Sequence, residues 1–221
     1  MNFKNAPQIL PKIKQKSIKN FNQDLKERRR VEDVINKMKR QIRINGEKHT
    51  ATFHYITKYH YIPLWILVKV LSFGLINELF GILKEEDQKE IADFYKINSD
   101  DLKVYLSLLS NYRNLCAHED ILYEHKTQTY ISDTYYHKKL NISKNELGEY
   151  SKGKNDLFAL ILILKQVLQE DRFKEMMAEI NRCFDIFDLN VNTIEISKLY
   201  NKMGFPENYM DIIDIEGGLN E

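Results

Sequence analysis

The chain has 221 residues, of which 43% are hydrophobic and 29% are charged, and its formal net charge is only +1. This composition is typical of a folded globular protein and excludes an intrinsically disordered one. With 8 Gly and 4 Pro, the chain lacks the turn residues that many short strands would need, so we expect an all-α fold. Cys116 and Cys183 form no CxxC pattern, so we expect neither a zinc site nor a disulfide framework, which suits a reducing cytoplasm.

The N-terminal end concentrates the positive charge. Residues 1–48 hold 14 Lys and Arg against 5 Asp and Glu, whereas the rest of the chain holds 19 against 27. After two prolines, apolar residues from Phe21 to Ile42 recur at helical spacing, which predicts one long basic amphipathic helix ending near Asn45 and Gly46. We expect this arm, residues 1–48, to pack on a single helical domain formed by residues 49–221. Its charge favours a polyanion or an acidic protein surface as partner, although a solvated helix face has the same pattern.

The segment "PLWILVKVLSFGLINELFGIL", which begins at Pro63, is the most apolar of the chain. Proline suits a first helical turn, so the segment is predicted to be one central helix of a bundle. A transmembrane helix is the alternative, but Lys69 and Glu78 would then lie in hydrocarbon, so we expect no membrane partner. No apolar stretch of the kind that a secretory signal needs occurs at the N-terminus.

Further helices are predicted towards the C-terminus, separated by a long polar connection. The string "NSDD" provides a cap for a helix from about Leu102 to His118. Residues 120–154 are rich in Tyr and Lys without apolar periodicity, and connections of this length are usually functional or mobile. The other predicted helices are "EEDQKEIADFYK", "NDLFALILILKQVLQE", "RFKEMMAEINRCFDIFD" and a last one from about Thr193 to Met203.

Arg113, Asn114 and His118 form the constellation that carries chemistry. The Arg and the His are five residues apart, about 140° around an ideal helix, while Asn114 shares the face of His118 and could orient its imidazole. Histidine moves protons near neutral pH, and arginine grips phosphate oxygens through a planar fork. These two groups suit RNA cleavage, in which the 2'-hydroxyl loses its proton and charge develops on phosphorus. By spacing alone, the favoured explanation is a helix end that carries a dipole-complementing histidine and an exposed arginine.

RNA cleavage also requires a proton donor for the leaving oxygen, and one copy of the motif does not supply it. A two-fold homodimer would bring two His and two Arg to one groove, so we expect a homodimer. His49, His54 and His60 have no metal-ligand spacing, so no metal and no cofactor is expected. The residues expected to contact RNA are Arg28, Arg29, Arg30, Lys37, Lys39, Arg40 and Arg43 on the basic helix, and Tyr123 as a stacking platform.

The string "YRNLCAHED" resembles the R-N-x-x-x-H signature of HEPN domains, which are all-helical nucleic-acid-cleaving modules. Together with "HYIPLWILVKVLSFGLINELF" before it and "MGFPENY" after it, the sequence is similar to the abortive-infection (Abi) family of bacterial phage-defence proteins, from about Phe53 to Tyr209. The resemblance implies a dimeric HEPN helical bundle that acts as a metal-independent endoribonuclease toxin, with Arg113 and His118 as its catalytic pair. The chain departs from the family pattern at Ile121, where relatives often carry an arginine.

Two other functions remain open at this stage. The chain is either a HEPN-like regulatory module that binds RNA or protein without cutting, or an inhibitor-like subunit that pairs with a nucleotide-transferring partner. A toxic nuclease needs restraint, so we expect an RNA or protein antitoxin, with the basic arm as the place where an inhibitory RNA lies.

Overall fold

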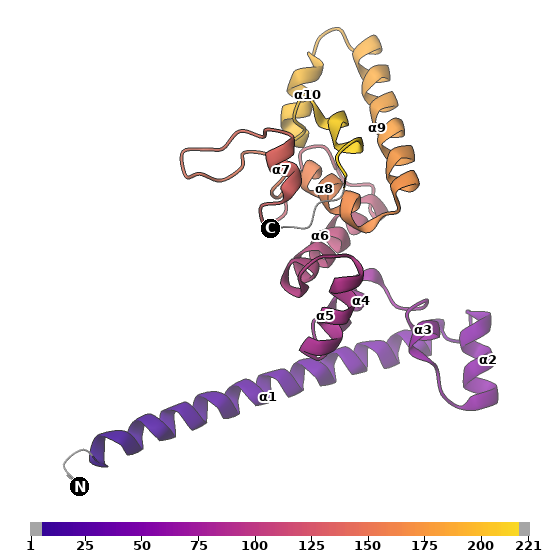
Figure 1. Cartoon of the computed structure of the whole chain (residues 1–221). Coiled ribbons are helices and arrows are strands. Elements are labelled where there is room, and N and C mark those ends of the chain that lie inside the picture. The colour runs from indigo at the N-terminus through magenta and orange to yellow at the C-terminus, as the bar shows by residue number, and fades with distance from the viewer. Residues whose placement is uncertain (1–5, 217–221) are drawn as a thin grey trace. The chain divides into compact units, whose positions relative to one another are not determined.

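The structure, a computed structural model, describes residues 6–216, with side chains from residue 23 onward (Figure 1). The described residues form ten α-helices and the short 3-10 helix η2, and they contain no β-strand, which confirms the all-α prediction. The chain divides after Ile82 into two compact units. The N-terminal unit contains α1 to α4, and the C-terminal unit contains α5 to η2.

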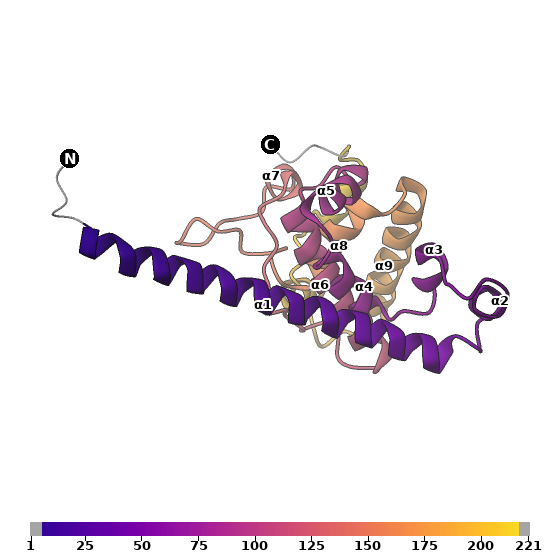
Figure 2. The same ribbon diagram turned by 90° about the horizontal axis from the view of Figure 1, so that it is seen from below.

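The N-terminal unit is built on one long helix. Helix α1 (Ala6–Asn45) is continuous in both views (Figures 1 and 2), and α2 (Thr50–Tyr59) follows it. The predicted end near Asn45 is confirmed, but α1 begins before the two prolines, whereas the apolar spacing predicted a helix that begins after them. Pro7 fits the first turn, where the backbone N–H that proline lacks has no helical acceptor in any case.

The apolar segment after Pro63 forms two short helices, so the prediction of one central helix was wrong. These are α3 (Leu64–Leu67) and α4 (Phe73–Phe80). Tight backbone hydrogen bonds, such as Val70 N–H to Leu67 O at 3.0 Å, end the first, and the Ser72 hydroxyl caps the second by accepting from Leu75 N–H at 3.3 Å. The break lets side chains from both halves of the segment pack against Val34 of α1. The resulting core consists of Val34, Leu67, Val70, Leu71 and Leu75.

Within the described residues, no helix combines the length and the apolar character that crossing a bilayer requires.

The C-terminal unit is a bundle around α8 (Leu157–Val167), the most apolar of its helices. Phe158, Ala159, Leu162 and Ile163 of α8 are fully buried, and α8 packs against α6 (Ser99–Ala117) and α9 (Glu170–Asn190). The remaining elements are α5 (Glu85–Phe94), α7 (Tyr135–Lys139), α10 (Ile196–Met203) and η2 (Tyr209–Ile213). The helices predicted between Glu85 and Met203 are present, and α7 lies within the connection that had no helical periodicity.

Candidate functional site

Helix α6 positions the Arg-Asn-His motif through its buried face. Asn98 caps the helix by accepting a hydrogen bond from Asp101 N–H at 2.7 Å, as the string "NSDD" predicted. Tyr105, Leu108 and Tyr112 are buried, so the residues that follow Tyr112 turn towards solvent. Burial raises the pKa of Tyr112 and keeps its hydroxyl neutral, and this hydroxyl donates to the backbone oxygen of His125 at 3.2 Å. The last turn of α6 is therefore anchored on its buried side through Tyr112, and its other side is exposed to solvent.

Arg113, Asn114 and His118 are all exposed on this last turn. The guanidinium of Arg113 donates to the side-chain oxygen of Asn114 at 3.2 Å. Asn114 therefore orients Arg113, whereas no described residue forms a hydrogen bond with the His118 ring. On a helix Asn114 shares a face with His118, so Arg113 is hydrogen-bonded to a residue of that face.

The backbone around His118 is held by a defined helix end. His118 is the C-cap residue, and its N–H donates to Asn114 O at 3.0 Å. Glu119 follows in the left-handed region with φ 57°, and Asp120 N–H reaches back to Leu115 O at 3.1 Å. This is a Schellman motif with a glutamate in the position that glycine usually takes. The motif holds the His118 backbone and leaves its ring available.

The segment after His118 folds back on the bundle. His125 Nε2 donates to the side-chain oxygen of Asn111 at 2.7 Å, a contact that sequence reasoning missed because it joins residues fourteen apart. Glu124 forms an ion pair with Lys202 of α10 at 2.8 Å. Near these residues, Tyr123 is 46% exposed and lines an apolar groove together with Phe184, Phe187 and other residues of α9 and α10. Tyr123 thus has an accessible ring, as a stacking platform requires.

The basic residues predicted to contact RNA lie on α1, in the N-terminal unit. Lys37 forms ion pairs with Asp33 at 2.9 Å and with Glu78 at 2.8 Å, so its charge is already balanced. The Arg30 guanidinium packs against Gly81 at the end of α4. It lies so close that a Cβ atom added to Gly81 would be 2.5 Å from Nη2 of Arg30. The other five basic residues are exposed, and their charges face solvent: Arg28, Arg29, Lys39, Arg40 and Arg43.

The three histidines of the N-terminal unit take part in capping α2 or in aromatic packing. His49 caps α2, where its Nδ1 accepts from Thr52 N–H at 3.3 Å. His54 packs edge-on against Tyr55 and Tyr59, each with ring centroids 5.8 Å apart, and His60 ends α2 in the left-handed region.

One family model, described as Abi-like protein, matches residues 4–124 of the chain, which include α2 to α6 and the whole Arg-Asn-His motif. The match ends before the string "MGFPENY". Neither the curated proteins nor the solved structures contain a match to the chain.

Proposed function

Since the chain belongs to the Abi-like protein family, which suggests a role in abortive infection and phage defence, we propose that it is a HEPN-type endoribonuclease that cleaves single-stranded RNA without a metal ion. One observation supports this proposal: Arg113, Asn114 and His118 are all exposed at the end of α6, and the Arg113 guanidinium donates to the Asn114 side chain at 3.2 Å. A phosphate-binding cation and a group able to move protons are thereby available at one exposed place.

Each residue has a distinct task in the proposed reaction. His118 removes the proton from the 2'-hydroxyl, whose oxygen attacks the neighbouring phosphorus. Arg113 stabilises the negative charge that develops on the phosphoryl oxygens, and Asn114 positions Arg113. The 5'-oxygen leaves with a proton, so the products are a 2',3'-cyclic phosphate and a 5'-hydroxyl. DNA lacks the 2'-hydroxyl and is not cut.

We further propose that the active species is a homodimer, in which the second copy of His118 donates the proton to the leaving oxygen. An exposed helix end carrying all three residues suits such a composite site, because a second copy can approach it without rearrangement of the bundle. An excess of inactive His118→Ala protein should then lower cleavage by the wild type, since a mixed dimer has only one histidine at its site. Unchanged cleavage despite subunit exchange would contradict the composite site.

The proposal is tested with purified protein and labelled single-stranded RNA in the presence of EDTA. The wild type should produce fragments that end in a cyclic phosphate. The cleavage rate of His118→Ala should be lower by a factor of about a hundred or more. His54→Ala is the matched control, because His54 is also an exposed helical histidine but lies in the other unit. Cleavage by His118→Ala at the wild-type rate would remove His118 from the mechanism. Full toxicity of His118→Gln in cells would instead favour a module that binds without cutting.

A further inference from the structure

The Lys-rich and Tyr-rich connection between α6 and α8 folds into an ordered pocket. The lining of this pocket, of about 540 Å³, includes Tyr135, Lys138 and Lys139 of α7 and Tyr150, and we call it the α7 pocket. Residues 144–150 turn back on themselves, with Asn145 N–H donating to Glu149 O at 2.8 Å and an isolated bridge joining Lys144 to Tyr150. The sequence marks this segment only as a connection.

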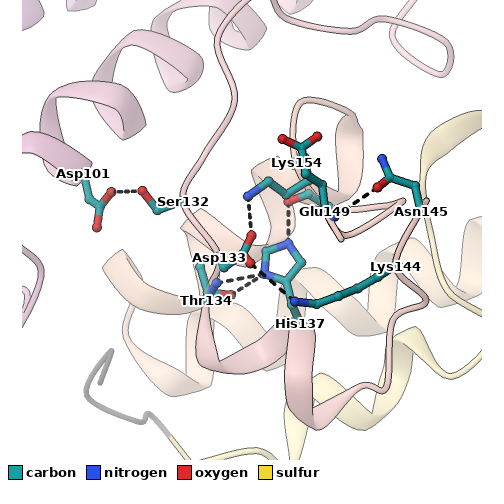
Figure 3. A network of polar contacts seen from close by, with 10 residues as sticks. Asp101, Ser132, Asp133, Thr134, His137, Lys144, Asn145, Glu149 and Lys154 are labelled. Atoms are coloured by element: carbon teal, nitrogen blue, oxygen red, sulfur yellow. Dashed lines mark hydrogen bonds and ion pairs between the residues drawn. The ribbon is translucent and has the colours of Figure 1, made fainter. Parts of the chain in front are cut away.

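A buried histidine holds the pocket together (Figure 3). His137 is fully buried; its Nδ1 accepts from Thr134 N–H at 3.0 Å, and its Nε2 donates to Gly153 O at 2.9 Å. The imidazole stacks on the Tyr150 ring with centroids 4.7 Å apart. Tyr150 is thus positioned by a rigid support, and little side-chain freedom remains to be lost when a ligand binds.

The α7 pocket carries an excess of positive charge. Lys139 Nζ lies over the Tyr135 ring at 5.2 Å, and Lys144 Nζ lies over the Tyr150 ring at 4.5 Å. Among the described residues, no carboxylate forms an ion pair with Lys138 or Lys139.

The acidic residue in the lining does not cancel this charge. Asp133 is held by Lys154, whose Nζ lies 2.6 Å from its carboxylate, and Lys144 lies 4.0 Å away (Figure 3). Burial opposes the ionisation of Asp133, but the hydrogen bond and the positive charge of Lys154 outweigh it and lower the pKa of Asp133. Lys138 and Lys139 therefore line a pocket whose one carboxylate is already paired with Lys154 and Lys144. This excess stands out because residues 49–221 are acidic as a whole, with 19 Lys and Arg against 27 Asp and Glu.

We propose that the α7 pocket is a second RNA-binding site, which holds the backbone of a single strand while the strand is cut at His118. Lysines that lack acidic partners attract phosphates, and tyrosine rings beside them provide surfaces on which bases or ribose can stack. An acidic polypeptide as ligand would use the lysines but would have no need of the tyrosine rings. The inference rests on the proposed function for its substrate, but the binding itself does not depend on cleavage.

The two sites are separated along α6. Ser132, next to the pocket residue Asp133, donates a hydrogen bond to Asp101 in the first turn of α6 at 2.5 Å (Figure 3). His118 lies at the other end of this helix. A helix of this length spans roughly 28 Å. A dinucleotide is too short to reach both places, and a longer strand can reach both. The α7 pocket should therefore affect long substrates only.

Binding is measured by fluorescence anisotropy with a labelled RNA oligonucleotide, with EDTA present and His118→Ala in every protein to prevent cleavage. Lys138→Gln/Lys139→Gln should weaken binding at least several-fold and reduce the slope of log affinity against log salt by about 1.4, which corresponds to two lost phosphate contacts on a single strand. The matched control is Lys89→Gln/Lys96→Gln, which removes the same charge from exposed positions on and just after α5 and should have a smaller effect. Tyr135→Leu should also weaken RNA binding but should not affect poly-glutamate.

The outcomes separate this proposal from the proposed function. Equal RNA affinity and equal salt slope for the two double variants would show that the α7 pocket does not bind RNA, even if the wild type cleaves RNA. Weaker RNA binding by the pocket variant alone would uphold the pocket, even if no chain cleaves RNA. With His118 restored, the pocket variant should show a raised KM for the long substrate and an unchanged rate on a dinucleotide. Poly-glutamate that competes as well as RNA would show that the pocket recognises acidic polypeptides and would overturn the assignment to RNA.

Discussion

The guanidinium of Arg113 donates a hydrogen bond of 3.2 Å to the side-chain oxygen of Asn114, the next residue along α6. Asn114 is thus a positioning residue in the proposed reaction. We expect Asn114→Ala to lower the cleavage rate about tenfold, because the freed Arg113 spends less time near the phosphate. Arg113→Lys should have a larger effect, since lysine keeps the charge but lacks the planar fork. Single-turnover cleavage at saturating RNA measures both variants, and wild-type rates for both would contradict these roles.

The surroundings of His137 predict a loss of stability in mild acid. Burial is the main cause that lowers the pKa of His137 to about 4, from an ordinary value of 6.5. Between these two values the unfolded chain binds the proton more readily than the folded one, so the contribution of His137 is complete above about pH 6.5 and declines as the pH falls towards 4. The full shift corresponds to about 3 kcal/mol of unfolding free energy.

Urea unfolding at several pH values, followed by circular dichroism, measures this dependence. His137→Gln should have a lower stability at pH 7 and a flatter pH profile than the wild type between pH 6.5 and pH 4. The difference between the two profiles isolates His137, because other titrating groups are common to both proteins. Parallel profiles would show that His137 does not become protonated on unfolding.

Substitution by alanine at two glycines with similar φ angles should lower the unfolding free energy by very different amounts. Gly204 has φ +79°, and a Cβ there would lie 2.1 Å from the carboxylate of the buried Asp156, which caps α8. Gly148 has φ +78°, and a Cβ there would meet nothing within 4 Å. We expect Gly148→Ala to cost about 1 kcal/mol of unfolding free energy for backbone strain alone, and Gly204→Ala to cost about 3 kcal/mol or more. Thermal or urea unfolding distinguishes them, and equal costs would refute the contact with Asp156.

The ion pairs of α1 divide its lysines into those available to RNA and those already neutralised. Lys39 and Arg43 are exposed one turn apart, whereas Lys37 is paired with Asp33 and Glu78. Lys39→Gln/Arg43→Gln should weaken RNA binding and lower its salt slope by about 1.4. Lys37→Gln should have little effect on the slope, because its charge is balanced before RNA arrives. Binding assays in the His118→Ala background compare them, and a larger effect of Lys37→Gln would contradict this division.

The positions of the main helices could be predicted because their signals are local. Asn98 as a cap, the apolar spacing of α6 and the continuous apolar run of α8 each act over a few neighbouring residues. The break at Ser72 was not predicted, because the segment is apolar on both sides of it; the Ser72 cap and packing against Val34 together accompany the two short helices. Helix α7 gave no periodic signal, because its stability depends on the burial of His137 under Gly153, sixteen residues away.

For the candidate site, the sequence by itself determined that Arg113, Asn114 and His118 are the candidate residues and that they lie at the end of a helix. Helical spacing placed Arg113 and His118 about 140° apart and went no further. Tertiary structure decided the rest: His125 bonds Asn111 beside the motif, Lys37 is neutralised by Glu78, and α7 and the returning Tyr150 together line the α7 pocket. The reason is that spacing along a helix defines where a side chain begins, whereas contacts between residues far apart in the sequence decide where its charged end lies and whether that charge is available.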